Sequence, residues 1–256
     1  MTPDVSVVIP LRDELPNIAL LHDEWTGVLA QLGRPYELIL IDDGSTDGTF
    51  GAVAAVAAED PAVRAVRFTR NFGQTAAFSA GFDLARGRYI VTADGDLQND
   101  PADLPLMLEV ARRYEIVCGW RRQRCDAFLT RHVPSVVANR LLALVSGVRI
   151  HDNGCSLKVF RAEVVKALAL QPGMHRYLPA LASQTGGRVA EVVVHHRPRR
   201  FGASKYDLSR TFIVLRDLVR LRRLMREAAT PPARRTPIYE IAEVREAEAA
   251  GSHLLD

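Results

Sequence analysis

Cysteine is scarce in this sequence. The 256 residues include three, Cys118, Cys125 and Cys155, and no two of them are spaced as Cys-x-x-Cys. Disulfide-stabilised domains and zinc knuckles need paired or closely spaced cysteines, so the sequence supports neither. We therefore expect a protein of the reducing cytosol.

Long hydrophobic runs are also missing. The longest apolar stretches, residues 51–58 and 141–148, fall short of the roughly 20 residues that a membrane-spanning helix needs. The N-terminus has no basic segment followed by an apolar one, so we expect no signal peptide and no membrane span.

Two nucleotide-binding motifs are absent. Ile9, at the end of the first predicted strand, is followed by Pro10 and Leu11 rather than by a Gly-x-Gly-x-x-Gly turn, and there is no Gly-Lys-Ser/Thr sequence. These absences argue against a dinucleotide-dependent oxidoreductase and a P-loop ATPase. The net charge of +3 is too small to indicate a nucleic-acid partner.

Short β-branched runs alternate with helical patterns over the first 119 residues. The predicted strands cover residues 5–9, 37–42, 63–68, 89–93 and 115–119, and the predicted helices cover residues 17–32, 46–59, 74–85 and 101–114. This alternation predicts an α/β fold with parallel strands and helices on both faces. An amphipathic segment (126–146), a turn (151–156), two helices (162–170 and 176–184) and a strand (189–194) follow.

Acidic side chains follow two of the predicted strands. Asp94 and Asp96 end one apolar run, with Gln98 two residues further on, and Asp42 and Asp43 end another. Side chains two residues apart on a strand point the same way, so Asp94, Asp96 and Gln98 offer a partial oxygen shell for Mg²⁺ or Mn²⁺. A solvated acidic loop is the alternative. An EF-hand does not fit, because its sixth and twelfth positions would be Asn99 and Pro105.

Several motifs in one order resemble family 2 glycosyltransferases, and within them the polyprenyl-phosphate sugar transferases. The motifs are Val7-Val8-Ile9-Pro10, Ile41-Asp42-Asp43-Gly44-Ser45-Thr46-Asp47, Arg70-Asn71-Phe72-Gly73-Gln74, Asp94-Gly95-Asp96-Leu97-Gln98, Asp152-Asn153-Gly154-Cys155 and Gly202-Ala203-Ser204-Lys205-Tyr206. Together they span residues 5–207, which is far more specific than any one of them.

The resemblance implies a GT-A fold, with a single Rossmann-like, mostly parallel sheet, that binds a nucleotide-diphosphate sugar. It implies a metal, Mg²⁺ or Mn²⁺, at Asp94, Asp96 and Gln98, and Asp152 beside the reacting centre. The implied nucleotide-sugar contacts are Pro10, Asp42, Asp43, Asn71, Gln74 and Asp94. The implied catalytic residues are Asp96, Asp152, Arg200 and Lys205, and the implied contacts of the acceptor phosphate are Arg131, Arg200, Ser204 and Lys205.

Three features depart from the family pattern. Arg12-Asp13-Glu14 replaces an aromatic-Asn-Glu sequence, and Lys158 stands where relatives tend to carry Arg, so a bidentate phosphate contact would become a point charge. The membrane helices that follow the catalytic domain in many relatives are missing, although residues 234–239 are similar to the segment found beyond them. His195 and His196 stay outside the predicted site, and Trp120 is interpreted as a core or rim aromatic.

The domain prediction is a catalytic domain at 1–207, a basic amphipathic helix at 208–228 and a flexible tail at 229–256. The helix either lies in an anionic membrane surface or packs on the domain. The first alternative predicts a cytoplasmic protein, peripheral at the membrane, that works at the lipid surface or with a separate membrane protein.

The predicted reaction is inverting transfer of a sugar from a nucleotide-diphosphate sugar, UDP-linked rather than GDP-linked, to a polyprenyl phosphate. Two alternatives remain open. One is elongation of a saccharide at a hydroxyl group, with Asp152 as the base. The other is an idle scaffold protein, which the intact Asp94, Asp96, Gln98 and Lys205 argue against.

Overall fold

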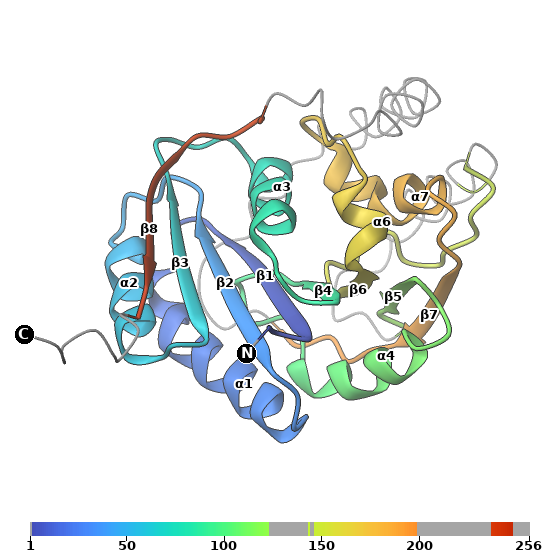
Figure 1. The fold of residues 1–256 in the computed structure, drawn as a ribbon, viewed down its shortest axis with the longest axis horizontal. Coiled ribbons are helices and arrows are strands. Elements are labelled where there is room, and N and C mark those ends of the chain that lie inside the picture. The colour runs from blue at the N-terminus through green and yellow to red at the C-terminus, as the bar shows by residue number, and fades with distance from the viewer. Residues whose placement is uncertain (1, 123–142, 144–145, 199–236, 248–256) are drawn as a thin grey trace, which may run out of the picture.

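The computed structural model describes residues 2–122, 143, 146–198 and 237–247. These residues form one sheet of eight strands in the order β7-β5-β6-β4-β1-β2-β3-β8, with helices on both faces (Figure 1). Six strands run in one direction, and β6 and β8 run against them. The predicted α/β class and its mostly parallel sheet are confirmed.

The elements follow the predicted alternation closely in the first half. The strands are β1 (Val5–Leu11), β2 (Tyr36–Asp42), β3 (Val63–Phe68), β4 (Tyr89–Thr92), β5 (Ile116–Trp120), β6 (Lys158–Arg161), β7 (Val189–Val193) and β8 (Ile241–Glu246). The helices are α1 (Ile18–Gln31), α2 (Thr49–Glu59), α3 (Gln74–Leu84), α4 (Leu104–Val110), α6 (Ala162–Lys166) and α7 (Leu178–Ser183), with short 3-10 turns η1 (Leu15–Asn17), η2 (Pro101–Asp103) and η3 (Met174–Tyr177).

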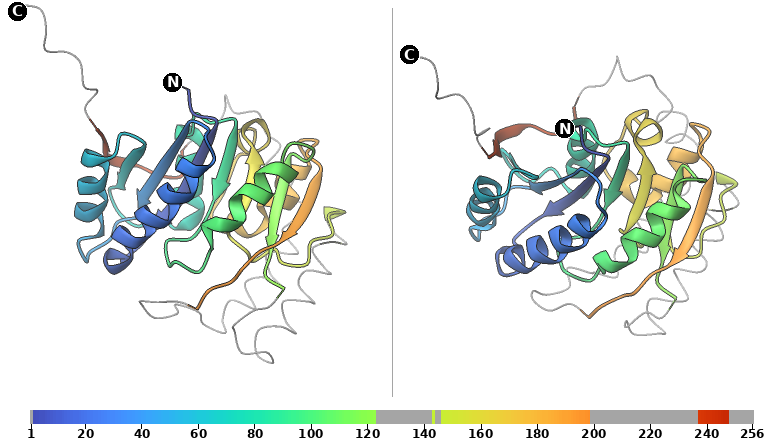
Figure 2. Two further views of the ribbon diagram at one scale, coloured as in Figure 1. Left: turned by 90° about the horizontal axis from the view of Figure 1, so that it is seen from below. Right: turned by 60° about the horizontal axis from the view of Figure 1, so that its bottom comes forward.

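Two hydrophobic layers hold the helices to the sheet. Residues of α1, α2 and α4 pack on one face, and residues of α3, α6 and α7 pack on the other (Figure 2). In α1 the apolar residues Ile18, Leu21, Trp25 and Leu29 recur at helical spacing and are fully buried. The central strands are buried on both faces, which explains why they read as continuous apolar runs rather than as alternating ones.

Strand β6 is the main departure from the predicted sheet. Lys158–Arg161 inserts between β4 and β5 and runs antiparallel to both. Its four residues lie between the predicted turn at 151–156 and the predicted helix at 162–170, where the sequence predicted no strand. β4 is equally short but wholly apolar or aromatic up to its last residue, whereas β6 has only Val159 and Phe160 between two cationic residues, too few apolar side chains to mark a strand.

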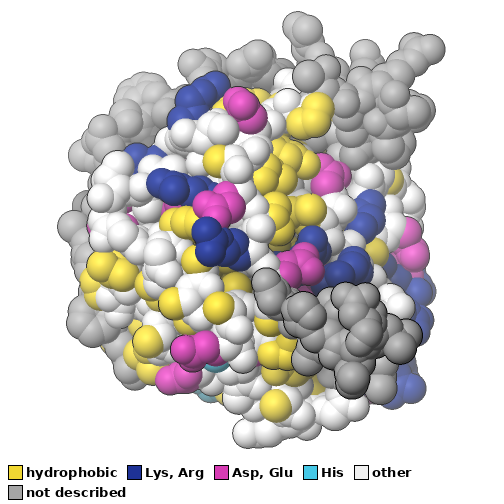
Figure 3. All heavy atoms as spheres, turned by 60° about the vertical axis from the view of Figure 1, so that its left-hand side comes forward, with side chains coloured by type: hydrophobic (Ala, Val, Ile, Leu, Met, Phe, Trp, Pro, Cys, Tyr) yellow, Lys and Arg dark blue, Asp and Glu magenta, His cyan; other side chains and the backbone are white. Residues whose placement is uncertain are grey.

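The expectation of a flexible tail at 229–256 is wrong for Ile241–Glu246, which form β8 on the open edge of β3. The strand is polar because little of it is buried: Val244 is exposed, and Arg64 pairs with Glu246 across the ladder. An edge strand satisfies the backbone groups of its neighbour whatever its composition. Figure 3 shows this side of the molecule, where acidic, basic and hydrophobic side chains are interspersed.

Within the described residues no helix is both long and apolar enough to cross a membrane. The predicted amphipathic segment 126–146 lies almost entirely, and the predicted helix 208–228 completely, outside the residues that the structure describes.

Candidate active site

The two acidic clusters lie at one edge of the sheet, on either side of β1. Leu11, the last residue of β1, pairs with Asp42 of β2, and Val8 pairs with Thr92 of β4. The loops after β1, β2 and β4 therefore leave the sheet side by side. In open parallel sheets ligands bind at this carboxyl edge.

Pro10 occupies a central strand, where a residue without an N–H normally breaks a ladder. The pairing of β1 with β4 stops at Val8, two residues earlier, so the N–H that Pro10 lacks would have had no ladder partner on the β4 side. The sheet opens at this point, between the two acidic loops.

Asp43 holds the loop between β3 and α3. Its Oδ1 accepts the Phe72 N–H at 2.7 Å, and its Oδ2 accepts the Gly73 N–H at 2.9 Å. Burial raises the pKa of Asp43, and the two backbone N–H groups oppose that shift. Both carboxylate oxygens are therefore engaged within the protein.

Gly44 fits closely against the same loop. It has a positive φ of 68°, and a Cβ atom there would lie 2.6 Å from the Arg70 carbonyl carbon and 2.7 Å from the Asn71 nitrogen. No side chain fits in that space. The absence of a Cβ therefore lets the loop after β2 and the loop that carries Asn71 touch through their backbones.

Asp42 differs from Asp43 in having a free acceptor. Its Oδ1 accepts the Ser45 N–H at 3.2 Å, whereas its Oδ2 is buried and accepts no hydrogen bond from the residues that the structure describes. A buried acceptor without a donor is costly, so such a group is a position where a ligand N–H or O–H would be stabilised.

Gln74 connects the start of α3 to the second acidic cluster. Its Nε2 donates to Asp94 Oδ1 at 2.8 Å, and the Asp94 N–H donates to Asn99 Oδ1 at 2.9 Å. Ser156 Oγ donates to the same Asn99 oxygen at 2.9 Å. Asp94 is thus fixed from α3, from its own loop and from the segment before β6.

The turn that carries Asp96 is strained and buried. Leu97 has a φ of 63°, a left-handed conformation that is uncommon for a residue with a side chain, while its side chain is buried in the core. Asp96 is 7% exposed, and its Oδ1 accepts the Gln98 N–H at 3.2 Å. Such strain persists where the surrounding packing enforces it, and it is frequent at functional sites.

This oxygen set suits a metal that takes its remaining ligands from a substrate. Among the described residues no three His, Cys, Asp or Glu side chains form a ready-made metal cage. Asp94 and Asp96 would supply two carboxylates, and Gln98 would supply an amide oxygen. Mg²⁺ and Mn²⁺ are commonly held by one or two carboxylates together with substrate phosphates and water, so the residues fit such an ion.

Asp152 is held by a residue that no sequence motif singled out. Arg121 Nε donates to Asp152 Oδ2 at 2.7 Å and Arg121 Nη2 to Oδ1 at 3.0 Å, and both side chains are largely buried. Burial lowers the pKa of Arg121, but the hydrogen bonds and charge of Asp152 outweigh it and raise the pKa above its usual value. In the sequence Arg121 is only one of several closely spaced arginines.

Lys158 binds the turn that carries Asp152 and does not face the carboxyl edge of the sheet. Its Nζ donates to the carbonyl oxygens of Asn153 and Cys155, and its side chain is buried in β6. The predicted contact between Lys158 and a substrate phosphate has no support in this arrangement, because the ammonium group faces its own backbone.

Two further pairs lie near the site. The rings of Trp120 and His151 stack at 4.3 Å, and Glu191 holds the His151 N–H and ring nitrogen. His196 Nε2 lies 3.5 Å from Gln98 Nε2. The prediction from sequence excluded Trp120 and His196 from the site. A single aromatic residue or histidine has no sequence pattern that would include it.

The predicted contacts of the acceptor phosphate, Arg131, Arg200, Ser204 and Lys205, lie outside the described residues. They stay predictions.

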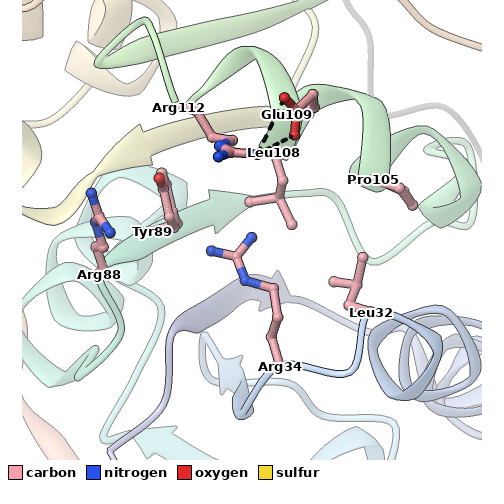
Figure 4. Close-up of a pocket in the computed structure, with 8 residues that line it drawn as sticks. All are labelled: Leu32, Arg34, Arg88, Tyr89, Pro105, Leu108, Glu109 and Arg112. Atoms are coloured by element: carbon pink, nitrogen blue, oxygen red, sulfur yellow. Dashed lines mark hydrogen bonds and ion pairs between the residues drawn. The ribbon is translucent and has the colours of Figure 1, made fainter.

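A cavity of about 550 Å³ lies elsewhere, beside the start of β4 (Figure 4). The guanidinium groups of Arg34 and Arg88 lie over the Tyr89 ring at 5.2 and 5.3 Å, and Arg34 also pairs with Asp4. Arg112 pairs with Glu109. The cavity opens at the end of the strands opposite to the acidic loops, and two of its three arginines are ion-paired.

The chain belongs to glycosyl transferase family 2, whose model matches residues 6–169. It is 43% identical over 233 residues to dodecaprenyl-phosphate galacturonate synthase of Rhizobium johnstonii, covering 89% of this chain and 69% of that protein. It is 36% identical over 217 residues to undecaprenyl-phosphate 4-deoxy-4-formamido-L-arabinose transferase of Yersinia enterocolitica, covering 84% of this chain and 66% of that protein. The chain thus spans about two thirds of the length of these relatives.

Solved structures agree on the fold. Glucosyl-3-phosphoglycerate synthase from Mycobacterium tuberculosis in complex with Mn²⁺ and uridine-diphosphate-glucose superposes with a TM-score of 0.64 at 19% identity, covering 95% of this chain and 89% of that chain. A mannosyltransferase from Pyrobaculum calidifontis in complex with GDP-Man and Mn²⁺ superposes with a TM-score of 0.54 at 21% identity, covering 75% of this chain and 55% of that chain. The fold is GT-A, as the sequence predicted.

Gly44→Ala tests the contact between the two loops, with Gly33→Ala as the matched control. Both glycines have a positive φ, but a Cβ at Gly33 meets nothing within 4 Å. We expect Gly33→Ala to lose about 1–2 kcal/mol of unfolding free energy from the backbone alone, and Gly44→Ala to lose roughly 1–3 kcal/mol more from the clash. Urea denaturation measures both, and equal losses would contradict the contact.

Proposed function

We propose that this glycosyltransferase moves a sugar from a nucleotide-diphosphate sugar to a polyprenyl phosphate, using Mg²⁺ or Mn²⁺. The observation that carries the proposal is the single edge at which the loops of Asp42, Gln74 and Asp94 meet. The printed names of the two relatives, one a dodecaprenyl-phosphate and the other an undecaprenyl-phosphate enzyme, support the class of acceptor.

The donor nucleoside would lie over the loops after β2 and β3. Asp42, with its unpartnered Oδ2, is the proposed acceptor for a base or ribose hydrogen, whereas Asp43 positions the loop that carries Asn71. This assignment makes Asp42 the contact and Asp43 its support. We infer a UDP-linked donor, with inversion at the anomeric carbon.

The diphosphate would lie beside Pro10 and Gln74, against Asp94, Asp96 and Gln98, the three residues that would hold the metal. A bound divalent cation there would offset the charge that develops on the leaving nucleoside diphosphate. The protein's own part is to keep the carboxylates in place: Gln74 orients Asp94, and the strained turn at Leu97 fixes Asp96.

The state of Asp152 favours a phosphate acceptor over a hydroxyl acceptor. A sugar hydroxyl needs a base, and Asp152, the candidate, has its two oxygens bound by the buried Arg121. A carboxylate in such an ion pair is a poor proton acceptor. A lipid phosphate is already an anion and needs positive charge rather than a base. We therefore propose that Asp152 and Arg121 shape the acceptor side.

The acceptor phosphate would meet Arg131, Arg200, Ser204 and Lys205, and the protein would work at the cytoplasmic membrane surface, alone or with a separate membrane protein. These residues come from the sequence motif and its basic surroundings. The basic segment 208–228 would provide attraction to anionic lipids.

Asp96→Ala tests the metal site. We expect transfer to fall on the order of 100-fold or more, because the ion would lose a ligand, while the melting temperature stays close to that of the wild type. The readout is release of nucleoside diphosphate across a Mn²⁺ titration. Asp23→Ala, which removes an exposed carboxylate from α1, is the control. Activity that persists in Asp96→Ala and in EDTA would refute the metal site.

Lys205→Ala tests the acceptor site. We expect a higher KM for polyprenyl phosphate and an unchanged KM for the donor, and a smaller change for Ser204→Ala, because a cation binds phosphate more strongly than a neutral hydroxyl does. Steady-state kinetics with the lipid in detergent micelles measures both constants. If Lys205→Ala leaves the KM for the lipid unchanged, Lys205 does not bind the acceptor.

A further inference from the structure

The segment 237–247 returns from the C-terminal part of the chain to the donor side of the sheet. β8 pairs with β3 from Arg64↔Glu246 to Phe68↔Ile241, and beyond that pair the Thr69 N–H donates to the Glu240 carbonyl at 3.1 Å. The contact between the two segments therefore continues past the end of β3, into the loop of residues 69–73. This is the loop that Asp43 holds from the other side.

Tyr239 joins the two elements that flank this loop. Its ring stacks on Phe68, the last residue of β3, with a centroid distance of 5.5 Å and an interplanar angle of 9°. Its hydroxyl donates to Asp83 Oδ2, near the end of α3, at 2.8 Å. Burial and the Asp83 carboxylate raise the pKa of Tyr239, so the hydroxyl keeps its proton and remains a donor.

The stack continues into the loop itself. Phe72 meets Phe68 edge to face at 5.7 Å, and the Arg70 guanidinium lies 4.0 Å from the centroid of the Phe72 ring. The backbone N–H of Phe72 is one of the two that Asp43 binds. Contacts therefore run from Tyr239 through Phe68 and Phe72 to Asp43.

We propose that Tyr239 is a positioning residue for the donor nucleotide. It sets the loop of residues 69–73 by fixing β3 against α3, and so places Asn71 and Gln74 without touching the nucleotide itself. This inference rests on the proposed function, because it assigns the nucleoside diphosphate to these loops. Tyr239 thereby gives the C-terminal segment a part in donor binding, although its sequence was predicted to be a flexible tail.

The variants separate the stack from the hydrogen bond. Tyr239→Ala removes both, while Tyr239→Phe and Asp83→Asn weaken or remove the hydrogen bond and keep the ring. Val244→Ala is the matched control, since Val244 lies in β8, the strand that follows Tyr239, and has an exposed side chain. Coupling through packed contacts changes affinity by about 2- to 30-fold. We expect a loss in this range for Tyr239→Ala, a smaller one for Tyr239→Phe, and none for Val244→Ala.

Two readouts keep the inference separate from the proposed function. The first is hydrogen exchange at the Phe72 and Gly73 amides, which needs no ligand: it should quicken in Tyr239→Ala while the amides of β1 and β2 stay protected. The second is calorimetric binding of UDP with Mn²⁺. Tyr239→Ala should raise the Kd, and in turnover assays the KM for the donor, more than it lowers kcat.

The outcomes are distinct. If wild-type protein binds neither UDP nor GDP, the proposed function fails, and the positioning of donor by Tyr239 fails with it, whatever the exchange data. If the wild type binds and Tyr239→Ala matches Val244→Ala in both readouts, the inference alone is overturned. Should Tyr239→Ala fail to fold, the Tyr239→Phe and Asp83→Asn pair decides: losses in both variants that do not add in the double variant support the inference, and additive losses or wild-type behaviour overturn it.

Discussion

The candidate site depends on the two hydrogen bonds that the Asp43 carboxylate accepts. By accepting the N–H groups of Phe72 and Gly73, it ties the end of β2 to the start of α3. This link places Gln74 where it can reach Asp94. A carboxylate with two backbone donors has a fixed orientation, and burial makes each of those hydrogen bonds costly to lose. The loops of the proposed donor side are therefore held together by the protein's own hydrogen bonds.

The two sides of the carboxyl edge are built differently. On the donor side, loops are joined to each other by backbone contacts and by one buried carboxylate, and a carboxylate oxygen of Asp42 is left for a ligand. On the other side, β6 is inserted against the direction of its neighbours, and the turn before it is held by the Arg121–Asp152 ion pair and by Lys158. Arg121 and Asp152 are engaged with each other, and Lys158 with backbone carbonyl groups. This contrast supports the proposed arrangement. The half that would bind the sugar donor offers hydrogen-bond acceptors, and the half that would bind the lipid phosphate needs additional cations.

Sequence patterns predicted the first half of the fold because β1, β2 and β4 are almost wholly buried and alternate with helices, which leaves a strong signal. They failed at β6, which has only two apolar residues between two cationic ones, and at β8, half of whose residues are charged because it lies on an edge. The motifs placed Asp42, Asp94 and Asp96 on one edge. They did not distinguish Asp42 from Asp43, and they did not identify Arg121, because a partner distant in sequence leaves no local pattern.

The central claim is that this edge transfers a sugar to a lipid phosphate. The most direct measurement incubates the protein, Mn²⁺ and polyprenyl phosphate with a panel of labelled UDP-sugars that includes UDP-galacturonate, and follows label into the organic phase. We expect one UDP-sugar to give an organic-soluble product that forms only with the lipid phosphate and is lost in EDTA. Transfer of label to a saccharide hydroxyl instead, or no product from any UDP- or GDP-sugar, would contradict it.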